Sequence, residues 1–283
     1  MKKIGFLSFG HWTPSPQSGT RSAADTLLQS IDLAVAAEEL GADGAYFRVH
    51  HFARQLSSPF PLLAAIGAKT KRIEIGTGVI DMRYENPMYM AEDAGAADLI
   101  SGGRLQLGIS RGSPEQVIDG WRHFGYVPQE GEDESDMARR HTEVLLEVLR
   151  GEGFAKPNPQ PMFPNPPGLL RLEPHSEGLR DRIWWGAGSN ATAVWAATLG
   201  MNLQSSTLKD DETGEPFHIQ QAKQTVLLTR CTTYYSPRGM RYSGRINAPH
   251  GGQNRISKEA TSIFPHARSL NSRIKFSYRI PRL

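Results

Sequence analysis

The segment Ser101–Gly112, with the sequence SGGRLQLGISRG, combines an apolar run with a charged end. The run Leu105–Ile109 is entered through a glycine pair and left through Ser110-Arg111-Gly112, which is typical of a buried parallel strand. The carboxyl ends of such strands are where repeating strand–helix proteins bind ligands. Arg111 at that end suits a phosphate, because its planar guanidinium forms paired hydrogen bonds. The alternative is a surface arginine that only closes a strand.

A second chemical signal is the histidine pair His50-His51, which follows another apolar run. Imidazole titrates near neutrality, so the pair can supply a general acid or base, or a hydrogen bond to a ring substituent. No Cys or carboxylate lies at ligand spacing around the pair, so the sequence predicts no metal site there. A loop histidine that caps a strand end is the competing interpretation.

A third signal is the segment 186–192, GAGSNAT, between an apolar run and a predicted helix. Its small residues allow close backbone approach, and Ser189 and Thr192 add hydroxyls beside the free amides of a helix start. This pattern predicts an anion site that would complement Arg111, whereas an ordinary N-cap at Ser189 or Asn190 is the alternative. No GxGxxG or GxxxxGK[ST] motif is present, which disfavours nicotinamide-dinucleotide and nucleoside-triphosphate binding.

Six strand–helix alternations position these residues. Each apolar run is followed by a segment with helical spacing, and the helix-to-strand turns are short, which favours a parallel sheet. The predicted strands are 3–9, 45–49, 73–80, 105–109, 182–185 and 201–205, and the predicted helices 22–41, 61–70, 87–100, 137–150, 190–199 and 215–224. The expected fold class is α/β, an incomplete (β/α)8 TIM-type barrel, with a doubly wound open sheet as the alternative.

Two insertions interrupt this rhythm. Residues 113–136 carry an acidic cluster at 130–136, which we expect to be a solvated loop. Residues 151–181 include the proline-rich stretch 156–167, which must be extended because proline removes backbone donors and fixes φ. A rigid connector is the favoured reading of the proline-rich stretch, with a peptide ligand for another domain as the alternative.

The charge is distributed unevenly along the 283 residues. The segment 225–283 has 11 Lys and Arg residues and one acidic residue, whereas 1–224 has 21 basic and 28 acidic residues, a net charge of −7. An acidic body disfavours nucleic acid as a partner. No apolar stretch approaches the ~20 residues of a membrane span and Cys231 is the only cysteine, so we expect a cytoplasmic protein without membrane association.

The same boundary divides the chain into two predicted domains, 1–224 and 225–283. The second part shows no sustained helical period and is scattered with Arg, Ser, Gly and Pro. Three explanations remain open: a basic binding tail, a weakly patterned subdomain, or a change of reading frame near residue 224. We favour the third, because the switch is abrupt and falls inside a predicted helix.

Five blocks over residues 1–224 resemble the bacterial luciferase-like flavin-dependent monooxygenases. They occur in the family's order and read AEELGADGAYFRVHHF (37–52), TKRIEIGTGVI (70–80), ENPMYMAED (85–93), LISGGRLQLGISRG (99–112) and IWWGAGSNATAVWAATLG (183–200). The resemblance implies a TIM barrel that binds reduced FMN from a partner flavin reductase and activates O2 to oxidise a small organic substrate. A homodimer or heterodimer is compatible with it.

The resemblance also assigns roles to individual residues. Arg111 corresponds to the arginine that grips the flavin phosphate, and Gly188, Ser189 and Thr192 to the phosphate-binding turn. His50 corresponds to a histidine implicated in luciferase catalysis.

Gly78-Val79 falls where the luciferase has a non-prolyl cis peptide beside the flavin ring. Two positions depart from luciferase: Val49 stands where it has a Glu, and Ser110 where it has a reactive Cys. The last two strand–helix units of the family are not recognisable in 225–283.

Three functions therefore remain under consideration. The leading one is an FMN-dependent monooxygenase of the luciferase-like class. The alternatives are a deazaflavin-dependent oxidoreductase of the same superfamily, and a non-catalytic flavin-binding protein.

Overall fold

Strands and helices alternate along the chain in the computed structural model, which describes residues 3–112, 115–205, 214–216 and 218–226. The elements are β1 (Gly5–Ser8), α1 (Ala23–Glu39), β2 (Gly44–Phe47), α2 (Pro59–Lys69), β3 (Glu74–Thr77), β4 (Ile80–Asp81), α3 (Pro87–Ile100), β5 (Leu105–Ser110), the 3-10 helix η1 (Gly120–Phe124), α4 (Glu134–Val148), the 3-10 helix η2 (Leu179–Arg182), β6 (Ile183–Ala187), α5 (Asn190–Thr198) and β7 (Asn202–Ser205). Residues 218–226 are also helical. The chain divides into two compact units, Met1–Gly186 and Ala187–Leu283.

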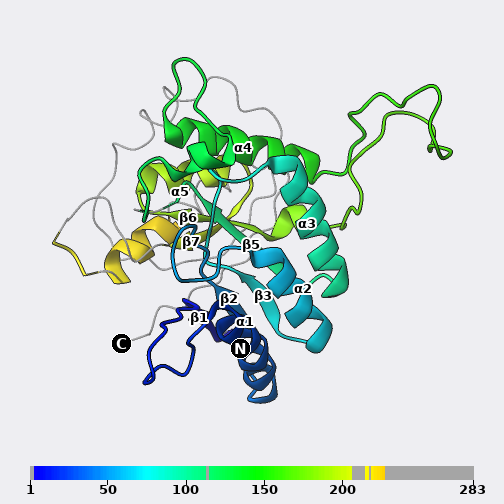
Figure 1. The fold of residues 1–283 in the computed structure, drawn as a ribbon. Helices are drawn as coiled ribbons and strands as arrows, with labels where there is room; N and C mark the ends of the chain where they lie inside the picture. Colours follow the sequence, from blue (N-terminus) through cyan, green and yellow to red (C-terminus); the bar gives the residue numbers. More distant parts are fainter. Residues whose placement is uncertain (1–2, 113–114, 206–213, 217, 227–283) are drawn as a thin grey trace, which may run out of the picture. The chain divides into compact units, whose positions relative to one another are not determined.

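The first unit is built on a parallel sheet whose strands follow one another in chain order, β1-β2-β3-β5-β6, with β4 also paired to β5 (Figure 1). Sequential order is the order of a (β/α) barrel, whereas a doubly wound sheet reverses direction at its switch point. The described residues therefore form part of a barrel, as the strand–helix alternation predicts. All carboxyl ends of these parallel strands meet at one edge.

The sheet is covered by helices whose apolar sides pack onto it. Every residue of β5 is buried, as expected for a strand with both faces covered. Helices α2 and α3 lie side by side in this layer (Figure 1). Ile66 of α2, Met90 of α3 and Ile75 of β3 are buried. This burial of an apolar strand and two apolar helix faces holds the strand ends in register.

The start of β5 is fixed by Arg104. Its guanidinium donates hydrogen bonds to the carbonyl oxygens of Ser101, Ile73, Gly67 and Thr70, at 2.6 to 3.0 Å. These acceptors come from the ends of α2 and α3 and from the residue before β3. The Arg104 side chain thus connects α2 and α3 to β3 and β5 by hydrogen bonds at the amino-terminal edge of the sheet.

Helix α4 begins earlier than the sequence pattern indicated. We expected the helix to start at Met137 and the acidic run before it to be a solvated loop. Instead, Asp133 is the N-cap and its carboxylate accepts a hydrogen bond from the backbone N–H of Asp136, at 2.8 Å. The acidic side chains of Glu134 and Asp136 therefore lie in the first helical turn, where the free amides and the helix dipole favour negative charge.

The third predicted strand, 73–80, is divided in two. β3 ends at Thr77 and β4 begins at Ile80, and Gly78-Val79 lies between them. Both pieces pair with β5, so the interruption falls inside the sheet and not at its margin.

The second unit contains α5, β7 and the helical residues 218–226, so the sixth predicted strand–helix unit is present over its described residues. The hydroxyl of Ser205 at the end of β7 donates to Gln224 Oε1 at 2.7 Å, and both side chains are buried. The tail 227–283 lies outside the described residues, and the predicted domain boundary at 224/225 stays a prediction.

The proline-rich segment extends away from the helices of the first unit as a long loop (Figure 1). Ala155 and Leu170 exchange backbone hydrogen bonds of 2.9 and 2.8 Å at its base, and no helix or strand forms between them. Met162 and Phe163 are largely exposed along it. The extended conformation expected from the prolines is consistent with this absence of regular structure.

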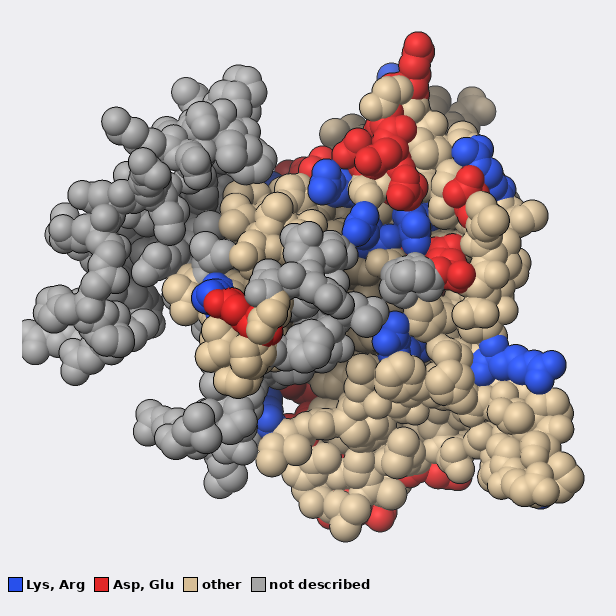
Figure 2. All heavy atoms as spheres, turned by 90° about the vertical axis from the view of Figure 1, so that its left-hand side faces the viewer, with Lys and Arg blue, Asp and Glu red and all other residues tan. Residues whose placement is uncertain are grey.

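Charged side chains do not form a single-sign surface on the face that Figure 2 draws. Acidic and basic residues alternate there, and a wide part of the described surface carries neither. Within the described ranges, no helix combines the length and the apolar character that crossing a membrane requires.

Candidate functional site

Five residues at the carboxyl edge of the sheet form a small floor, defined here as Leu7, Gly78, Val79, Ser110 and Gly186. All of them except the buried Ser110 are at least partly exposed. A Cβ added to Gly186 would lie 3.1 Å from Val79 Cγ1 and 3.4 Å from Ser110 Cβ, and one added to Gly78 would lie 3.0 Å from Leu7 Cδ1. These contacts connect β1, the β3–β4 junction, β5 and β6. Gly78, Val79 and Gly186 are only partly buried, although the strand residues around them are fully buried.

The peptide bond between Gly78 and Val79 is cis, which is the geometry that the family resemblance implies at this position. Whether these two residues contact a flavin is untested and stays a prediction.

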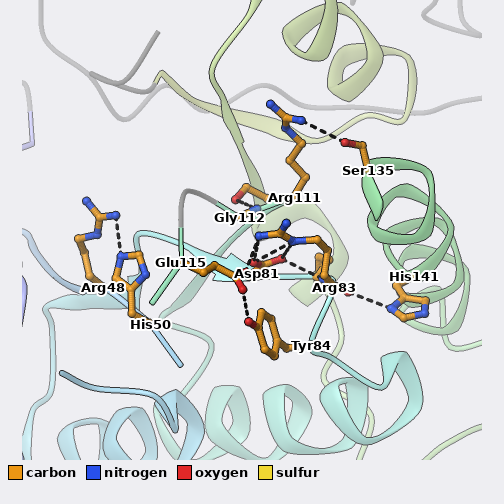
Figure 3. A network of polar contacts seen from close by, with 12 residues as sticks. Arg48, His50, Asp81, Arg83, Tyr84, Arg111, Gly112, Glu115, Ser135 and His141 are labelled. Carbon is orange, nitrogen blue, oxygen red and sulfur yellow. Dashed lines mark hydrogen bonds and ion pairs between the residues drawn. The ribbon is translucent and has the colours of Figure 1, made fainter. Parts of the chain in front are cut away.

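Arg111 leaves the carboxyl end of β5 directly after the floor residue Ser110. Its Nη1 donates to Ser135 Oγ at 3.0 Å, and Ser135 belongs to the first turn of α4. Figure 3 shows the guanidinium pointing toward Ser135 and away from the neighbouring Arg83. The predicted phosphate arginine thus lies at the strand end where the sequence indicated, beside a hydroxyl and a capped helix start.

The predicted phosphate turn, Gly188 to Thr192, is the start of helix α5. Ser189 is the N-cap, and Ser189 Oγ accepts from the backbone N–H of Thr192 at 3.4 Å. The backbone N–H of Ser189 donates in return to Thr192 Oγ1, which completes a capping box. The N-cap interpretation of this motif is confirmed. Its role toward an anion stays a prediction, because Arg111 belongs to the first unit and this turn to the second.

His50 lies beyond the end of β2, and its Nε2 is 2.8 Å from Nη2 of Arg48 (Figure 3). The backbone N–H of His50 donates to the carbonyl of Leu56, which fixes the residue at the strand end. Burial lowers the pKa of His50, and the positive charge of Arg48 lowers it further, although Glu115 acts in the opposite direction. His50 is therefore a neutral imidazole near pH 7.

His51 turns toward a different group of side chains. Its ring stacks on Tyr84 with centroids 4.3 Å apart and an interplanar angle of 22°, and Phe124 meets its edge. Its Nε2 is buried without a hydrogen-bond partner among the described residues. Burial also lowers the pKa of His51. The two adjacent histidines thus face different surroundings.

A polar network that we did not predict from the sequence lies beside the floor. Arg83 donates to both carboxylate oxygens of Asp81, with Nη2 to Oδ2 at 2.7 Å, and also to Glu115 (Figure 3). The other carboxylate oxygen of Glu115 accepts a hydrogen bond from the hydroxyl of Tyr84. Glu115 therefore ties the loop after β5 to the segment after β4.

Two carboxyl groups share one guanidinium in this network, and this raises the proton affinity of Asp81. Burial, followed by the neighbouring Glu115 carboxyl, raises the pKa of Asp81 to about 7 against the lowering effect of Arg83. Burial and the contact with Glu115 likewise raise the pKa of Tyr84. At neutral pH Asp81 is therefore near the midpoint of its titration, beside the positive charge of Arg83.

A sequence signal for part of this network exists. Arg83-Tyr84 comes one residue after the end of the buried strand β4, and polar residues near that position are expected at the ligand-binding edge of a parallel sheet. The partner Glu115 gives no such signal, because it lies 32 residues later in a segment without a pattern. No three His, Cys, Asp or Glu side chains in the described ranges are grouped so that they could hold a metal ion.

The two departures from luciferase are both buried. Val49, which stands in place of a Glu, is 4% exposed, so it adds no charge beside His50. Ser110, which stands in place of a reactive Cys, accepts the backbone N–H of Gly112 at Oγ (2.9 Å) and that of Met82 at its carbonyl (2.9 Å). Its hydroxyl therefore shapes the turn that carries Arg111.

The family description "luciferase-like monooxygenase" matches residues 7–217 of this chain. The uncharacterized protein YwcH of Bacillus subtilis is 30% identical over 203 residues, which cover 71% of this chain and 57% of YwcH. The chain thus spans little more than half the length of that curated relative.

Two solved structures have a similar fold. The oxygenating constituent of 3,6-diketocamphane monooxygenase from Pseudomonas putida, in complex with FMN, gives a TM-score of 0.61 at 19% identity over 82% of this chain and 63% of that one. A coenzyme F420-dependent tetrahydromethanopterin reductase from Methanopyrus kandleri gives a TM-score of 0.52 at 18% identity over 81% and 61%. At these identities the two structures show the shared fold alone.

Proposed function

This chain belongs to the luciferase-like monooxygenase family, and from that premise we propose that it is a flavin-dependent monooxygenase that uses reduced FMN and O2 to oxidise a small organic substrate. The observation that carries the proposal is the position of Arg111, at the strand end beside an accessible floor of small residues. A partner flavin reductase would supply the reduced FMN.

The described residues fit FMN on two grounds. At the floor, a Cβ added to Gly186 would meet Val79 and Ser110, so the glycine leaves a flat surface free for a planar ring. At its margin, Arg111 offers a charged fork beside the start of a helix, which suits a phosphate dianion.

Reduced FMN, when bound, supplies the two electrons that activate O2, so that one oxygen atom enters the substrate and the other leaves as water. The chain's own residues would bind the flavin, orient its ring and shield the reacting edge from water. Arg111 would hold the phosphate, with Gly188, Ser189 and Thr192 as further contacts, and Gly78-Val79 would lie against the ring. His50 would hydrogen-bond near the reacting edge of the flavin, and the apolar strand ends would exclude water.

The test is a titration of the purified full chain with oxidised FMN and, without oxygen, with photoreduced FMN. Flavin fluorescence and absorbance report binding, and an oxygen electrode then reports consumption when air is admitted. Photoreduction removes the need for a reductase. We expect saturable binding of reduced FMN. Because free reduced FMN also consumes O2, the decisive readout is an oxidised substrate that does not form without the protein.

The other outcomes separate the alternatives. Binding of FMN without any oxidised product, across a panel of aldehydes, ketones and aromatic substrates, would indicate the non-catalytic flavin-binding protein. Binding of coenzyme F420 in preference to FMN would indicate the deazaflavin-dependent oxidoreductase. Binding of none of these flavins would contradict the proposal for this chain.

A further inference from the structure

Arg48 is a feature of the site that neither the motif pattern nor the family resemblance singles out. It follows β2 directly and lies two residues before His50, so the alternation of an extended chain directs both side chains to the same side. Its Nη2 lies 2.8 Å from His50 Nε2 (Figure 3). This distance is that of a charge-assisted hydrogen bond.

The chemistry of the two groups decides which is the donor. A guanidinium carries only N–H groups and has no lone pair to offer, so Arg48 must donate and Nε2 must accept. An imidazole nitrogen that accepts carries no proton, and the single proton of a neutral ring is then on Nδ1. An imidazolium would set two N–H groups against each other, so this contact also disfavours protonation.

Arg48 is held in place independently of His50. Its backbone N–H donates to the carbonyl of Ser8 at 2.9 Å, and its guanidinium carbon lies 4.9 Å from the ring centroid of Phe9. The ring face attracts the cation and keeps it over β1. Arg48 Nε is buried with no partner among the described residues, so the contact with His50 is its main side-chain hydrogen bond there.

We infer that Arg48 is a positioning residue that fixes His50 as the neutral tautomer with its proton on Nδ1, so that His50 meets a ligand as a hydrogen-bond donor and not as a base. No described residue accepts a hydrogen bond from Nδ1, which leaves this nitrogen for a ligand. The tautomer follows from the geometry alone. The donor role toward a flavin or substrate acceptor atom rests on the proposed function.

The charges that face His50 support this assignment. From β2 and the loop after β1, Arg48 and His11 both lower its pKa, and burial lowers it most. From the loop after β5, Glu115 raises it, and the adjacent His51 lies within interaction distance. Two cationic or potentially cationic groups and burial thus act against one carboxylate, and the net direction favours the neutral ring.

The tautomer can be measured by nitrogen NMR on the full chain labelled with 15N-histidine, without any flavin. A two-bond proton–nitrogen correlation distinguishes a protonated Nδ1 from a protonated Nε2, and the variant His50→Gln identifies the His50 signals. We expect the Nδ1-protonated pattern, and we expect His50 to become charged at a lower pH than an exposed histidine does.

Variants then test the part played by Arg48. Arg48→Met keeps an unbranched stem without a donor or charge, so His50 should titrate at higher pH and change toward the Nε2-protonated form that predominates in free histidine. The matched control is Arg54→Met, which removes a guanidinium from the loop after His51, where it lies over Trp12 at 5.3 Å. This control should leave the His50 signals unchanged.

A proton on Nε2 of His50 in the wild-type chain would overturn the inference, and this result needs no folded variant. An unchanged His50 titration in a folded Arg48→Met chain would overturn the part assigned to Arg48. Circular dichroism establishes folding, and Arg48→Lys, which keeps a positive charge, should retain the low titration if Arg48→Met does not fold. Loss of flavin binding is a separate measurement and bears on the proposed function alone.

Discussion

Gly112 and Asp81 approach so closely that no side chain can stand between them. A Cβ added to Gly112 would lie 1.9 Å from Asp81 Oδ2, and the backbone of Gly112 has a φ of +91°, which favours glycine. Gly112 follows the phosphate arginine candidate Arg111, and Asp81 is held by Arg83. The turn that aims Arg111 is therefore packed directly against the polar network of Asp81, Arg83 and Glu115.

The variant Gly112→Ala should lose stability and loosen the Arg111 turn. The positive φ and the displaced carboxylate together should cost about 2–4 kcal/mol in the free energy of unfolding, measured by urea denaturation. The control Gly102→Ala has a φ of +67° and no atom within 4 Å of the added Cβ, so it should lose only about 1 kcal/mol. If Gly112→Ala and Gly102→Ala lowered the free energy of unfolding equally, the close approach of Gly112 to Asp81 would contribute nothing to stability.

The variant Arg111→Ala should weaken FMN binding more than riboflavin binding, because the two ligands differ only in the phosphate. Loss of a charge-assisted contact of about 1.5–3 kcal/mol corresponds to FMN affinity lower by roughly 10- to 100-fold. Fluorescence titration measures both ligands. Arg150→Ala, which removes an exposed arginine near the opposite end of α4, is the control and should change neither. The same loss for FMN and riboflavin would exclude a phosphate role.

The variant Asp133→Ala removes the N-cap of the helix whose first turn carries Ser135. It should cost about 1 kcal/mol of stability and lower FMN affinity several-fold, because Ser135 no longer stands firmly beside Arg111. Ser22→Ala removes the equivalent capping box of α1 and is the matched control. Ser22→Ala should cost a similar amount of stability and leave FMN affinity unchanged. If both variants lowered FMN affinity equally, the N-cap of α4 would have no specific effect on the Arg111 site.

The variant Asp81→Asn should remove a specific pH dependence of stability. Burial and Glu115 raise the pKa of Asp81 to about 7, whereas an unfolded aspartate titrates near 3.9. Between these values the folded state binds a proton that the unfolded state has lost. The contribution of Asp81 is therefore fully present below about pH 4 and is lost as the pH rises to about 7.

This prediction is checked by urea denaturation of both chains between pH 4 and pH 8. The free energy of unfolding of the wild type minus that of Asp81→Asn should fall through this interval and become level above about pH 7. Asp119→Asn, at an exposed carboxylate paired with Arg122, should follow the wild type throughout. If this difference in unfolding free energy instead rose with pH, the attraction of Arg83 would outweigh burial and keep Asp81 ionised.

The strand–helix alternation could be predicted from the sequence because each element carries its own local signal. Helix α3 spans Pro87–Ile100 as predicted, since Asn86 supplies an N-cap, Pro87 suits the first turn, and apolar residues recur at helical spacing. The sequence pattern places the start of α4 three residues late, because the acidic residues that cap this helix resemble a solvated loop in composition.

The side-chain network could not be predicted in the same way. The contact between Arg83 and Glu115 joins two strand ends, and it depends on the three-dimensional approach of β4 to β5 rather than on any local pattern. The contact between Arg48 and His50 differs from this long-range contact. Residues two apart in an extended chain have their side chains on the same face, so the sequence separation alone brings the two together. The sequence therefore held a usable signal for this pair.

The hydrogen bonds between Ala155 and Leu170 close the proline-rich loop at its base, so the sheet does not depend on what lies between them. Lengthening such a loop adds only the slowly growing entropy of closure, about 0.6 kcal/mol for each doubling. Residues 156–168 thus offer a permissive insertion point for an affinity tag or a fluorescent reporter. An insertion there would leave the carboxyl edge of the sheet, with Arg111 and His50, unaltered.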